Sequence, residues 1–382
     1  MIPFNKPYMT GRELEYIAQA HSNGHLSGDG GFTKKCHVWL EARTGTHRAL
    51  LTHSCTAALE MTAILADIQP GDEVIMPSYT FVSTANAFVL RSGVPVFVDI
   101  RPDTLNIDET KIETAITPRT KAIAPVHYAG VACEMDSIMD IARRHNLLVI
   151  EDAAQGVMSS YKGRPLGVIG HLGCYSFHET KNVISGEGGA LLVNAPQFML
   201  QAEIIREKGT DRSRFFRGEV DKYTWQEVGS SFLPSELSAA FLWAQLEEAE
   251  GITRARLERW HRYHDLLKPL ENQGSVRRPI VPIDCQHNAH MYYVLLSPGI
   301  DRQAVLDDMN NDGINAVFHY VPLHSSLAGQ KYGRQSGDLT ITDSISERLI
   351  RLPLWIGLTL DQQNSVVKSL NSAICKRDEE GL

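Results

Sequence analysis

The sequence has no tract rich in lysine or arginine, no long apolar run and no cysteine pattern of the kind that holds zinc. Its 382 residues carry a formal net charge of −8, which disfavours general binding to nucleic acid or to an anionic membrane surface. No stretch is apolar enough to span a membrane, and residues 1–16 contain no apolar segment typical of a secretory signal. The six cysteines form neither a C-x-x-C pair nor a Cys/His cluster. We therefore expect a cytoplasmic protein with reduced thiols.

Two common phosphate-binding motifs are also absent. The sequence contains no G-x-x-x-x-G-K-[ST] loop, which argues against a P-loop nucleotidase. No G-x-G-x-x-G follows the first predicted strand, which argues against a dinucleotide-binding Rossmann domain. No internal repeat or low-complexity segment is visible. A phosphate site, if there is one, must be built in another way.

From about residue 50 to residue 195, short apolar runs alternate with helical patterns. Continuous apolar strands separated by helices predict an α/β fold with a mostly parallel sheet covered by helices on both faces. In such sheets, ligands bind beyond the carboxyl ends of the strands. The predicted strands are 72–78, 94–100, 120–128, 146–154 and 188–194, with helices over 56–68 and 135–146 among those between them.

A second, smaller α/β domain is predicted after a long helical pattern over residues 234–270. We place a large cofactor-binding domain at 1–250, and the bridging helix with the small domain at 251–382, with Gly251 as the expected kink. The N-terminal segment is expected to pack on the small domain. In that domain, the patterns predict strands over 290–297 and 315–324 and helices over 301–313 and 360–374.

Four features carry groups suited to chemistry. Asp152 ends the best predicted strand, with Gln155 three residues later. Ser54 or Thr56 opens a helix, whose first amides and dipole favour an anion. Phe81 follows a strand, and its ring could lie flat on a planar cofactor.

The fourth feature is Lys181, which lies between "SFHET" and "GEGG". Taken singly, each feature has an ordinary explanation: a helix-capping acid, a plain N-cap, a core aromatic and a surface lysine. Together they supply a phosphate site, a stacking ring, an acid for a pyridinium nitrogen and an amine for a Schiff base. These are the requirements of a pyridoxal-phosphate enzyme.

Several segments extend this interpretation to a family. The segments "IPF", "PSYTFVSTANA", "EDAAQ", "SFHETKN", "GEGG" and "FHYVPLH" together span nearly the whole chain. They resemble the nucleotide-sugar aminotransferases of the DegT/StrS type, a branch of the fold-type I pyridoxal-phosphate enzymes. The resemblance implies that a sugar nucleotide and the amino donor L-glutamate are the substrates, and that the protein is a homodimer with shared active sites.

The resemblance also implies roles for single residues. Lys181 forms the Schiff base and moves protons, while Asp152 holds the pyridine nitrogen protonated. The other cofactor contacts implied are Gln155 at the phenolic oxygen, Phe81 on the ring, and Thr56, Ala57 and Ser176 at the phosphate. In the family, an asparagine of the neighbouring subunit usually reaches that phosphate, and Ser231 stands at the corresponding place.

The substrate contacts rest on the same resemblance. His319, Tyr320 and His324 in "FHYVPLH" lie near the sugar in the family, although a structural strand and turn would explain them equally well. Arg212, which shares its segment with two further arginines, is a source of positive charge for a diphosphate, with a solvated loop as the alternative.

Two other functions fit less well. Related sugar dehydratases carry histidine in place of the Schiff-base lysine, and some add an iron–sulfur cluster, whereas this chain has Lys181 and no cluster-type group of cysteines. Regulators that bind pyridoxal phosphate add a helix-turn-helix domain, and no basic domain is present here.

Overall fold

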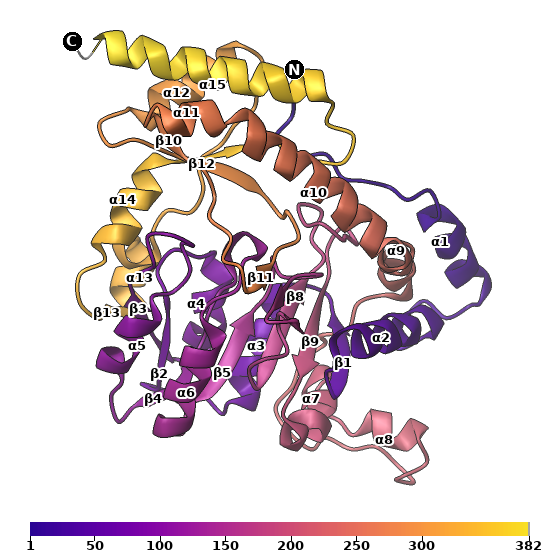
Figure 1. Cartoon of the computed structure of the whole chain (residues 1–382). Coiled ribbons are helices and arrows are strands. Elements are labelled where there is room, and N and C mark those ends of the chain that lie inside the picture. Colours follow the sequence, from indigo (N-terminus) through magenta and orange to yellow (C-terminus); the bar gives the residue numbers. More distant parts are fainter. Residues whose placement is uncertain (381–382) are drawn as a thin grey trace.

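The computed structural model describes residues 1–380, with side chains described as far as Lys376. Its centre is an eight-stranded sheet in the order β1-β9-β8-β5-β4-β2-β3-β13 (Figure 1). Only β9 runs against its neighbours, and the remaining strands share one direction. The predicted mostly parallel sheet is therefore confirmed. The strands are β1 (Arg48–Thr52), β2 (Glu73–Pro77), β3 (Val94–Val98), β4 (Thr120–Ile123), β5 (Leu148–Asp152), β8 (Leu172–Ser176), β9 (Gly189–Val193) and β13 (Arg334–Gln335).

Helices cover both faces of this sheet, which is why its strands are apolar along their length. One buried cluster joins the sheet to α1 (Glu13–Ser22), α2 (Gly31–Thr44), α5 (Glu109–Ala115), α6 (Met135–His145) and α9 (Glu236–Glu247). A second cluster joins the other face to α3 (Cys55–Leu65), α4 (Val82–Val89) and α7 (Met199–Arg206). A short α8 (Arg212–Phe216) follows α7, and three small strands, β6 (Ser160–Tyr161), β7 (Arg164–Pro165) and β11 (Cys285–Gln286), form a sheet of their own.

The C-terminal part has its own apolar cluster, built on a three-stranded sheet in the order β10-β12-β14. Predicted strand 290–297 contains β12, and predicted helices 301–313 and 360–374 correspond to α12 and α15. The elements are β10 (Val276–Arg277), β12 (Tyr292–Leu296), α12 (Arg302–Asn311), α13 (Leu327–Tyr332), α14 (Thr340–Arg348), β14 (Leu349–Leu352) and α15 (Leu360–Glu380). No helix among residues 1–380 is long and apolar enough to cross a membrane.

The predicted strand over 315–324 is wrong. Only Val317 makes a strand-like bridge, to Arg351, and Leu323–Ser325 form a 3₁₀ turn. Pro322 has no N–H to give to a ladder. The segment instead crosses toward the large sheet, which it contacts through individual side chains and not through a strand ladder.

The predicted bridging helix is three helices: α9, α10 (Ala249–Leu266) and α11 (Lys268–Asn272). The first break falls at Glu248, where the backbone leaves the helical region at φ −104° and ψ 8°. Gly251, the expected kink, lies inside α10. The expected break at Gly251 is therefore wrong by three residues.

The N-terminal residues lie against the C-terminal part. Ile2 bridges Ile314, and the indole of Trp355 donates a hydrogen bond to the Pro3 carbonyl at 3.1 Å. Helix α1 takes another place and packs on α9, where the Tyr16 hydroxyl donates to Glu247 at 2.6 Å.

Strand β13 ties the C-terminal part to the edge of the large sheet. It pairs with β3, and the Arg334 guanidinium donates from Nε and Nη2 to the buried Glu73 carboxylate at 2.9 and 2.8 Å. The hydrogen bonds of Arg334, with smaller contributions from Thr117 and Arg119, lower the pKa of Glu73 to about 2. Nearby, the buried Asp99 carboxylate accepts from the backbone of Thr342 at 2.8 Å and from Ile341 at 3.1 Å, at the start of α14. Residues of the far C-terminal half are thus anchored to the large sheet.

Candidate active site

The carboxyl ends of neighbouring strands bring the predicted groups to one edge of the sheet. Asp152 ends β5, and Ser176 ends the adjacent parallel β8. Lys181 lies in the turn between β8 and β9, while α3 starts directly after β1. Gln155, Ser176 and Lys181 line one small cavity, which Asn182, Asn288 and His290 also line.

Lys181 is the amine of this site. Its backbone N–H closes a turn onto the His178 carbonyl at 2.9 Å, which sets where the side chain starts. Burial lowers the pKa of the Lys181 ammonium; the nearby Cys55 and Asp152 oppose that shift, and the cation of Arg351 adds to it. A lowered pKa increases the neutral, nucleophilic fraction of a lysine at neutral pH.

Asp152 is held by two donors and is only 4% exposed. Its Oδ2 accepts from the Thr84 hydroxyl at 2.7 Å, and its Oδ1 accepts from the Ala154 N–H at 3.1 Å. Because the Thr84 hydroxyl gives its proton to Asp152, it takes a hydrogen bond from Thr80 at 2.9 Å. The carboxylate is therefore fixed in orientation while keeping lone pairs for a further donor.

The start of α3 forms a cradle of hydrogen-bond donors. The Ser54 hydroxyl caps the helix by accepting from the Ala57 N–H at 3.0 Å, so that amide is already used. This bond competes with a phosphate for the Ala57 amide, and the prediction that Ala57 contacts the phosphate stays a prediction. The amides of Cys55 and Thr56 are the free ones expected at a helix start. The Thr56 hydroxyl lies 2.8 Å from that of Ser83 in α4.

Gly189 brings the rest of the donor set to this helix. A Cβ at Gly189 would lie 2.4 Å from the Cys55 nitrogen, so only glycine lets β9 approach so closely. Gly189 pairs with Ser176 across β8 and β9, so Ser176 is the residue of β8 that lies opposite this close approach. Amides and hydroxyls at a positive helix end suit a phosphate group, so the residues present fit the phosphate of the predicted cofactor.

Phe81 and Gln155 both lie next to Tyr320. The Phe81 ring is 57% exposed at the start of α4, with its centroid 6.4 Å from that of Tyr320. The Gln155 amide accepts from the Ala129 N–H at 2.6 Å and donates to the Tyr320 hydroxyl at 2.9 Å. One amide hydrogen of Gln155 is left for a ligand oxygen.

Two of the three predicted sugar contacts, His319 and Tyr320, lie together. His319 stacks on Tyr320 at 3.7 Å and uses Nδ1 in a 2.7 Å hydrogen bond with Tyr128. His324 has no ring nitrogen to spare, because Nδ1 lies 2.7 Å from the Ser78 hydroxyl and Nε2 lies 3.2 Å from Asp343. These contacts are structural, and the prediction that His324 binds the sugar stays a prediction.

Arg212 lies outside this site in the single chain. It belongs to α8, which projects beyond α7 at the lower edge of the molecule, away from the middle strands (Figure 1). Its guanidinium lies 3.9 Å from Glu207 and over the Phe216 ring. The prediction of Arg212 as a diphosphate contact stays a prediction.

Ser231 also lies on the surface rather than in the cavity. It is exposed and bridges Glu207, while the next residue, Phe232, stacks on His53 at 6.3 Å.

Sequence reasoning missed several residues that the fold adds to the site. Thr84 and Tyr128 contact Asp152 and His319 through their hydroxyls, and Arg351 is the cation beside Lys181. His290 lines the cavity and lies 3.1 Å from Asn182. The available signals were the threonine that follows Phe81 by three residues and the arginine within the apolar run "LIRLPLW".

Comparisons with known proteins bear on this geometry. The model of the DegT/DnrJ/EryC1/StrS aminotransferase family matches residues 7–371. GDP-perosamine synthase of Caulobacter vibrioides is 33% identical over 377 residues, covering 96% of this chain and 97% of that protein. The spore coat polysaccharide biosynthesis protein SpsC of Bacillus subtilis is 31% identical, covering 98% and 97%.

A solved structure agrees with both the fold and the chemistry. The structure of S. venezuelae DesV, in complex with a ketimine intermediate, is 26% identical, covers 98% of each chain and has a TM-score of 0.87. The predicted fold class, cofactor and enzyme class are confirmed. The chain belongs to the DegT/DnrJ/EryC1/StrS aminotransferase family and is a pyridoxal-phosphate-dependent aminotransferase.

Proposed function

We propose that this enzyme transfers the amino group of L-glutamate to dTDP-4-keto-6-deoxy-D-glucose, giving dTDP-4-amino-4,6-dideoxy-D-galactose and 2-oxoglutarate. The substrate assignment rests on the segments "LSGDGGFT", "VHYAGVACEMD", "EKGTDRSRFFRGEVDKYTW" and "LIRLPLW". They resemble the enterobacterial transaminase that makes this amino sugar for enterobacterial common antigen. We place the reaction in the cytoplasm, as predicted from the sequence.

The observation that carries the chemistry is the meeting of Lys181, Asp152 and the α3 cradle at one sheet edge. When bound, pyridoxal phosphate supplies a carbonyl that accepts an amino group and a ring that withdraws electrons from it. Lys181 is placed to hold the cofactor covalently and to carry a proton, because burial favours its neutral amine. Asp152 would keep a proton on the ring nitrogen.

The remaining residues bind and orient. Thr56 and Ser176 would hold the phosphate, and Phe81 would cover one face of the ring. Gln155 has one amide hydrogen for the phenolic oxygen, and its other bonds to Ala129 and Tyr320 fix its orientation. His319 and Tyr320 lie on the sugar side of our proposed arrangement, and we leave His324 and Arg212 of the same chain out of it.

We also propose a homodimer with shared active sites. Ser231 is exposed in one chain and stands where the family carries a phosphate-binding asparagine of the neighbouring subunit. Mixing inactive Lys181→Ala with a Ser231 variant tests this arrangement. Recovered activity supports shared sites, whereas full cofactor affinity of Ser231→Ala removes that residue from the phosphate.

The alternative is transfer to another nucleotide-linked keto sugar, giving a C3 product or a gluco-configured C4 product. The name of the relative GDP-perosamine synthase, with a GDP-linked product, gives this alternative its support. The test is incubation with dTDP-4-keto-6-deoxyglucose and glutamate, followed by NMR of the amino sugar. A galacto-configured C4 amine supports the proposal, and a gluco product or turnover only with a GDP-linked sugar contradicts it. The Lys181→Ala variant is the blank.

A further inference from the structure

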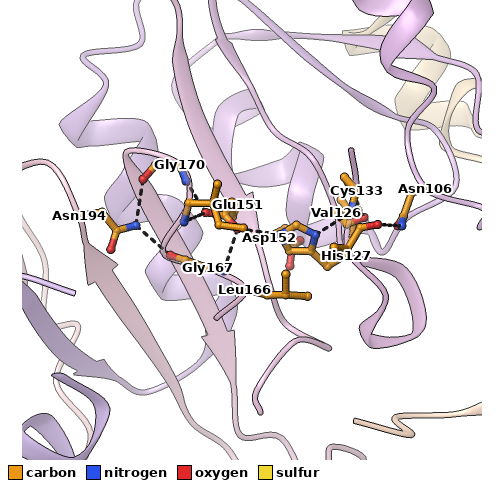
Figure 2. A network of polar contacts seen from close by, with 12 residues as sticks. Asn106, Val126, His127, Cys133, Glu151, Asp152, Leu166, Gly167, Gly170 and Asn194 are labelled. Carbon is orange, nitrogen blue, oxygen red and sulfur yellow. Dashed lines mark hydrogen bonds and ion pairs between the residues drawn. The ribbon is translucent and has the colours of Figure 1, made fainter. Parts of the chain in front are cut away.

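A buried polar pair lies directly behind the candidate active site. Glu151 precedes Asp152 on β5, and successive strand residues point to opposite faces, so its carboxylate points away from the cofactor side. Glu151 and His127 are both fully buried. Figure 2 shows the two side chains joined, with Asp152 next to them.

The Glu151 carboxylate is saturated with donors. One oxygen accepts from the Ile169 N–H at 2.6 Å and from the Gly170 N–H. The other accepts from the Gly167 N–H at 2.8 Å and from His127 Nε2 at 2.8 Å. Three of the four donors are backbone amides of one turn, so His127 is the single side chain that completes the set.

The state of His127 follows from its partners. Its Nδ1 lies 3.2 Å from the backbone nitrogen of Cys133, and because an amide can only donate, Nδ1 must accept. The ring proton is therefore on Nε2, where it is donated to Glu151 (Figure 2). The imidazole is neutral and has a fixed tautomer and orientation.

His127 also holds the active-site backbone directly. The backbone N–H of His127 donates to the Asp152 carbonyl at 3.1 Å, and the backbone N–H of Asp152 donates to the Pro125 carbonyl at 2.9 Å. The next two residues continue toward the site: the Tyr128 hydroxyl meets His319, and the Ala129 N–H donates to Gln155. Three consecutive residues thus each contact a candidate site residue.

This segment needs an external hold because its backbone is strained. Ala129 has φ +58°, in the left-handed region that residues with a Cβ seldom adopt. Such conformations persist where their surroundings over-determine them. Asn106 supplies part of that hold, with its Oδ1 accepting from the Tyr128 N–H at 2.8 Å and its Nδ2 donating to the Ala132 carbonyl at 2.8 Å.

We infer that the His127–Glu151 pair is a positioning device for the cofactor site, which keeps Asp152 and Gln155 in register with the bound ring. The inference rests on the proposed roles of those two residues toward pyridoxal phosphate, and it is independent of which sugar the enzyme uses. His127 and Glu151 are positioning residues because neither faces the cavity that contains Lys181.

The test compares two substitutions of His127 in the full-length enzyme. His127→Phe keeps most of the ring volume but removes the donor to Glu151, whereas His127→Gln keeps an N–H at a similar reach. We expect the dissociation constant of pyridoxal phosphate to rise at least 10-fold in His127→Phe, with a changed visible spectrum and a shifted pH dependence of that spectrum. His127→Gln should recover the wild-type dissociation constant to within about 3-fold.

The control is His171→Phe, a histidine directly before β8 whose ring contacts β5 at another point. His171 Nδ1 accepts from the Val149 N–H at 2.9 Å, three residues before Asp152, so its loss also perturbs β5. The control should lower stability to urea while leaving cofactor affinity and spectrum unchanged. If His127→Phe behaves like this control, the pair is structural only and the inference fails.

The inference can still be tested when His127→Phe folds poorly. His127→Gln is the milder change, and a Gln variant that folds but binds the cofactor no better than His127→Phe also overturns the inference. The titration uses pyridoxal phosphate alone, so a wrong sugar assignment leaves its result unaffected. If wild-type protein itself fails to bind the cofactor, the assignment of the site fails instead.

Discussion

The close approach of β9 to the start of α3 gives the sharpest test of the phosphate cradle. In Gly189→Ala, the new Cβ would lie 2.4 Å from the Cys55 nitrogen and the Ser54 carbonyl carbon, and 2.5 Å from the Ser54 oxygen. All three are backbone atoms, so no flexible side chain can move aside. Ordinary contact begins about 1 Å further out, and the helix start and the strand must therefore separate.

The magnitude follows from the general cost of overpacking. Inserting one methyl group into a well-packed interior costs about 1–3 kcal/mol. If that cost falls on the bound geometry of the cradle, pyridoxal phosphate binds roughly 5- to 150-fold more weakly. Apoenzyme prepared by dialysis and titrated with the cofactor, followed by absorbance, measures this directly, with urea unfolding of the same sample to verify the fold.

Gly31→Ala is the matched control. Gly31 starts α2, its backbone is not in the left-handed region, and no atom lies within 4 Å of the added Cβ. We expect wild-type cofactor affinity in this variant. Wild-type affinity in folded Gly189→Ala would refute the cradle at the start of α3.

Three further predictions concern single ionisable or hydrogen-bonding groups. Lys181→Met apoenzyme should unfold at a higher urea concentration than wild-type apoenzyme at pH 7. Burial lowers the lysine pKa and so destabilises the folded, charged form by about 1.4 kcal/mol per pKa unit. The difference in stability should narrow as the pH approaches 10.5, and equal stabilities at pH 7 contradict the prediction. Thr84→Val should lose a charge-assisted hydrogen bond to Asp152 worth about 1.5–3 kcal/mol. We expect kcat in steady-state assays to fall at least 10-fold in Thr84→Val and to stay near the wild-type value in Thr84→Ser. An unchanged kcat in Thr84→Val removes Thr84 from the site. The pKa of Glu73 is lowered from 4.5 to about 2, which corresponds to roughly 3 kcal/mol of stability that is present above pH 4.5 and lost as the pH falls toward 2. Arg334→Met should remove most of this stability, as measured by urea unfolding at a series of pH values. An unchanged dependence of stability on acid pH would show that Arg334 does not cause the lowered pKa.

The parts of the fold that the sequence predicted are those with local causes. Strands β2, β3, β4 and β5 are continuous apolar runs, and a parallel sheet buried on both faces requires that pattern. Asp152 could be proposed because it lies at the end of a predicted strand, where ligands bind in such sheets. Lys181 could be proposed because, with the other three features, it completes the set of groups that a pyridoxal-phosphate enzyme needs.

The sequence could not predict contacts between residues far apart in the chain. His324 looked available because its partners, Ser78 and Asp343, are invisible in its own segment. Thr84 was missed because the contact that gives it meaning, with Asp152, joins residues 68 positions apart.

The residue that caps α3 could not be predicted for a more local reason. The sequence allowed Ser54 or Thr56 as the cap, and only the structure shows that the Ser54 hydroxyl accepts from the Ala57 N–H. The place of Arg212 in α8 could not be predicted because charge in a segment says nothing about which part of the molecule that segment reaches.

The anchoring of β13 limits how the enzyme can open. Glu73 with Arg334, Asp99 with the start of α14, and Ser78 with His324 fasten the stretch from residue 323 to residue 343 to the edge strands of the large sheet. A hinge that swung the whole C-terminal part would have to break these buried bonds in every turnover. We therefore expect a bulky substrate to reach the exposed Phe81 ring and leave again without a swing of the whole C-terminal part.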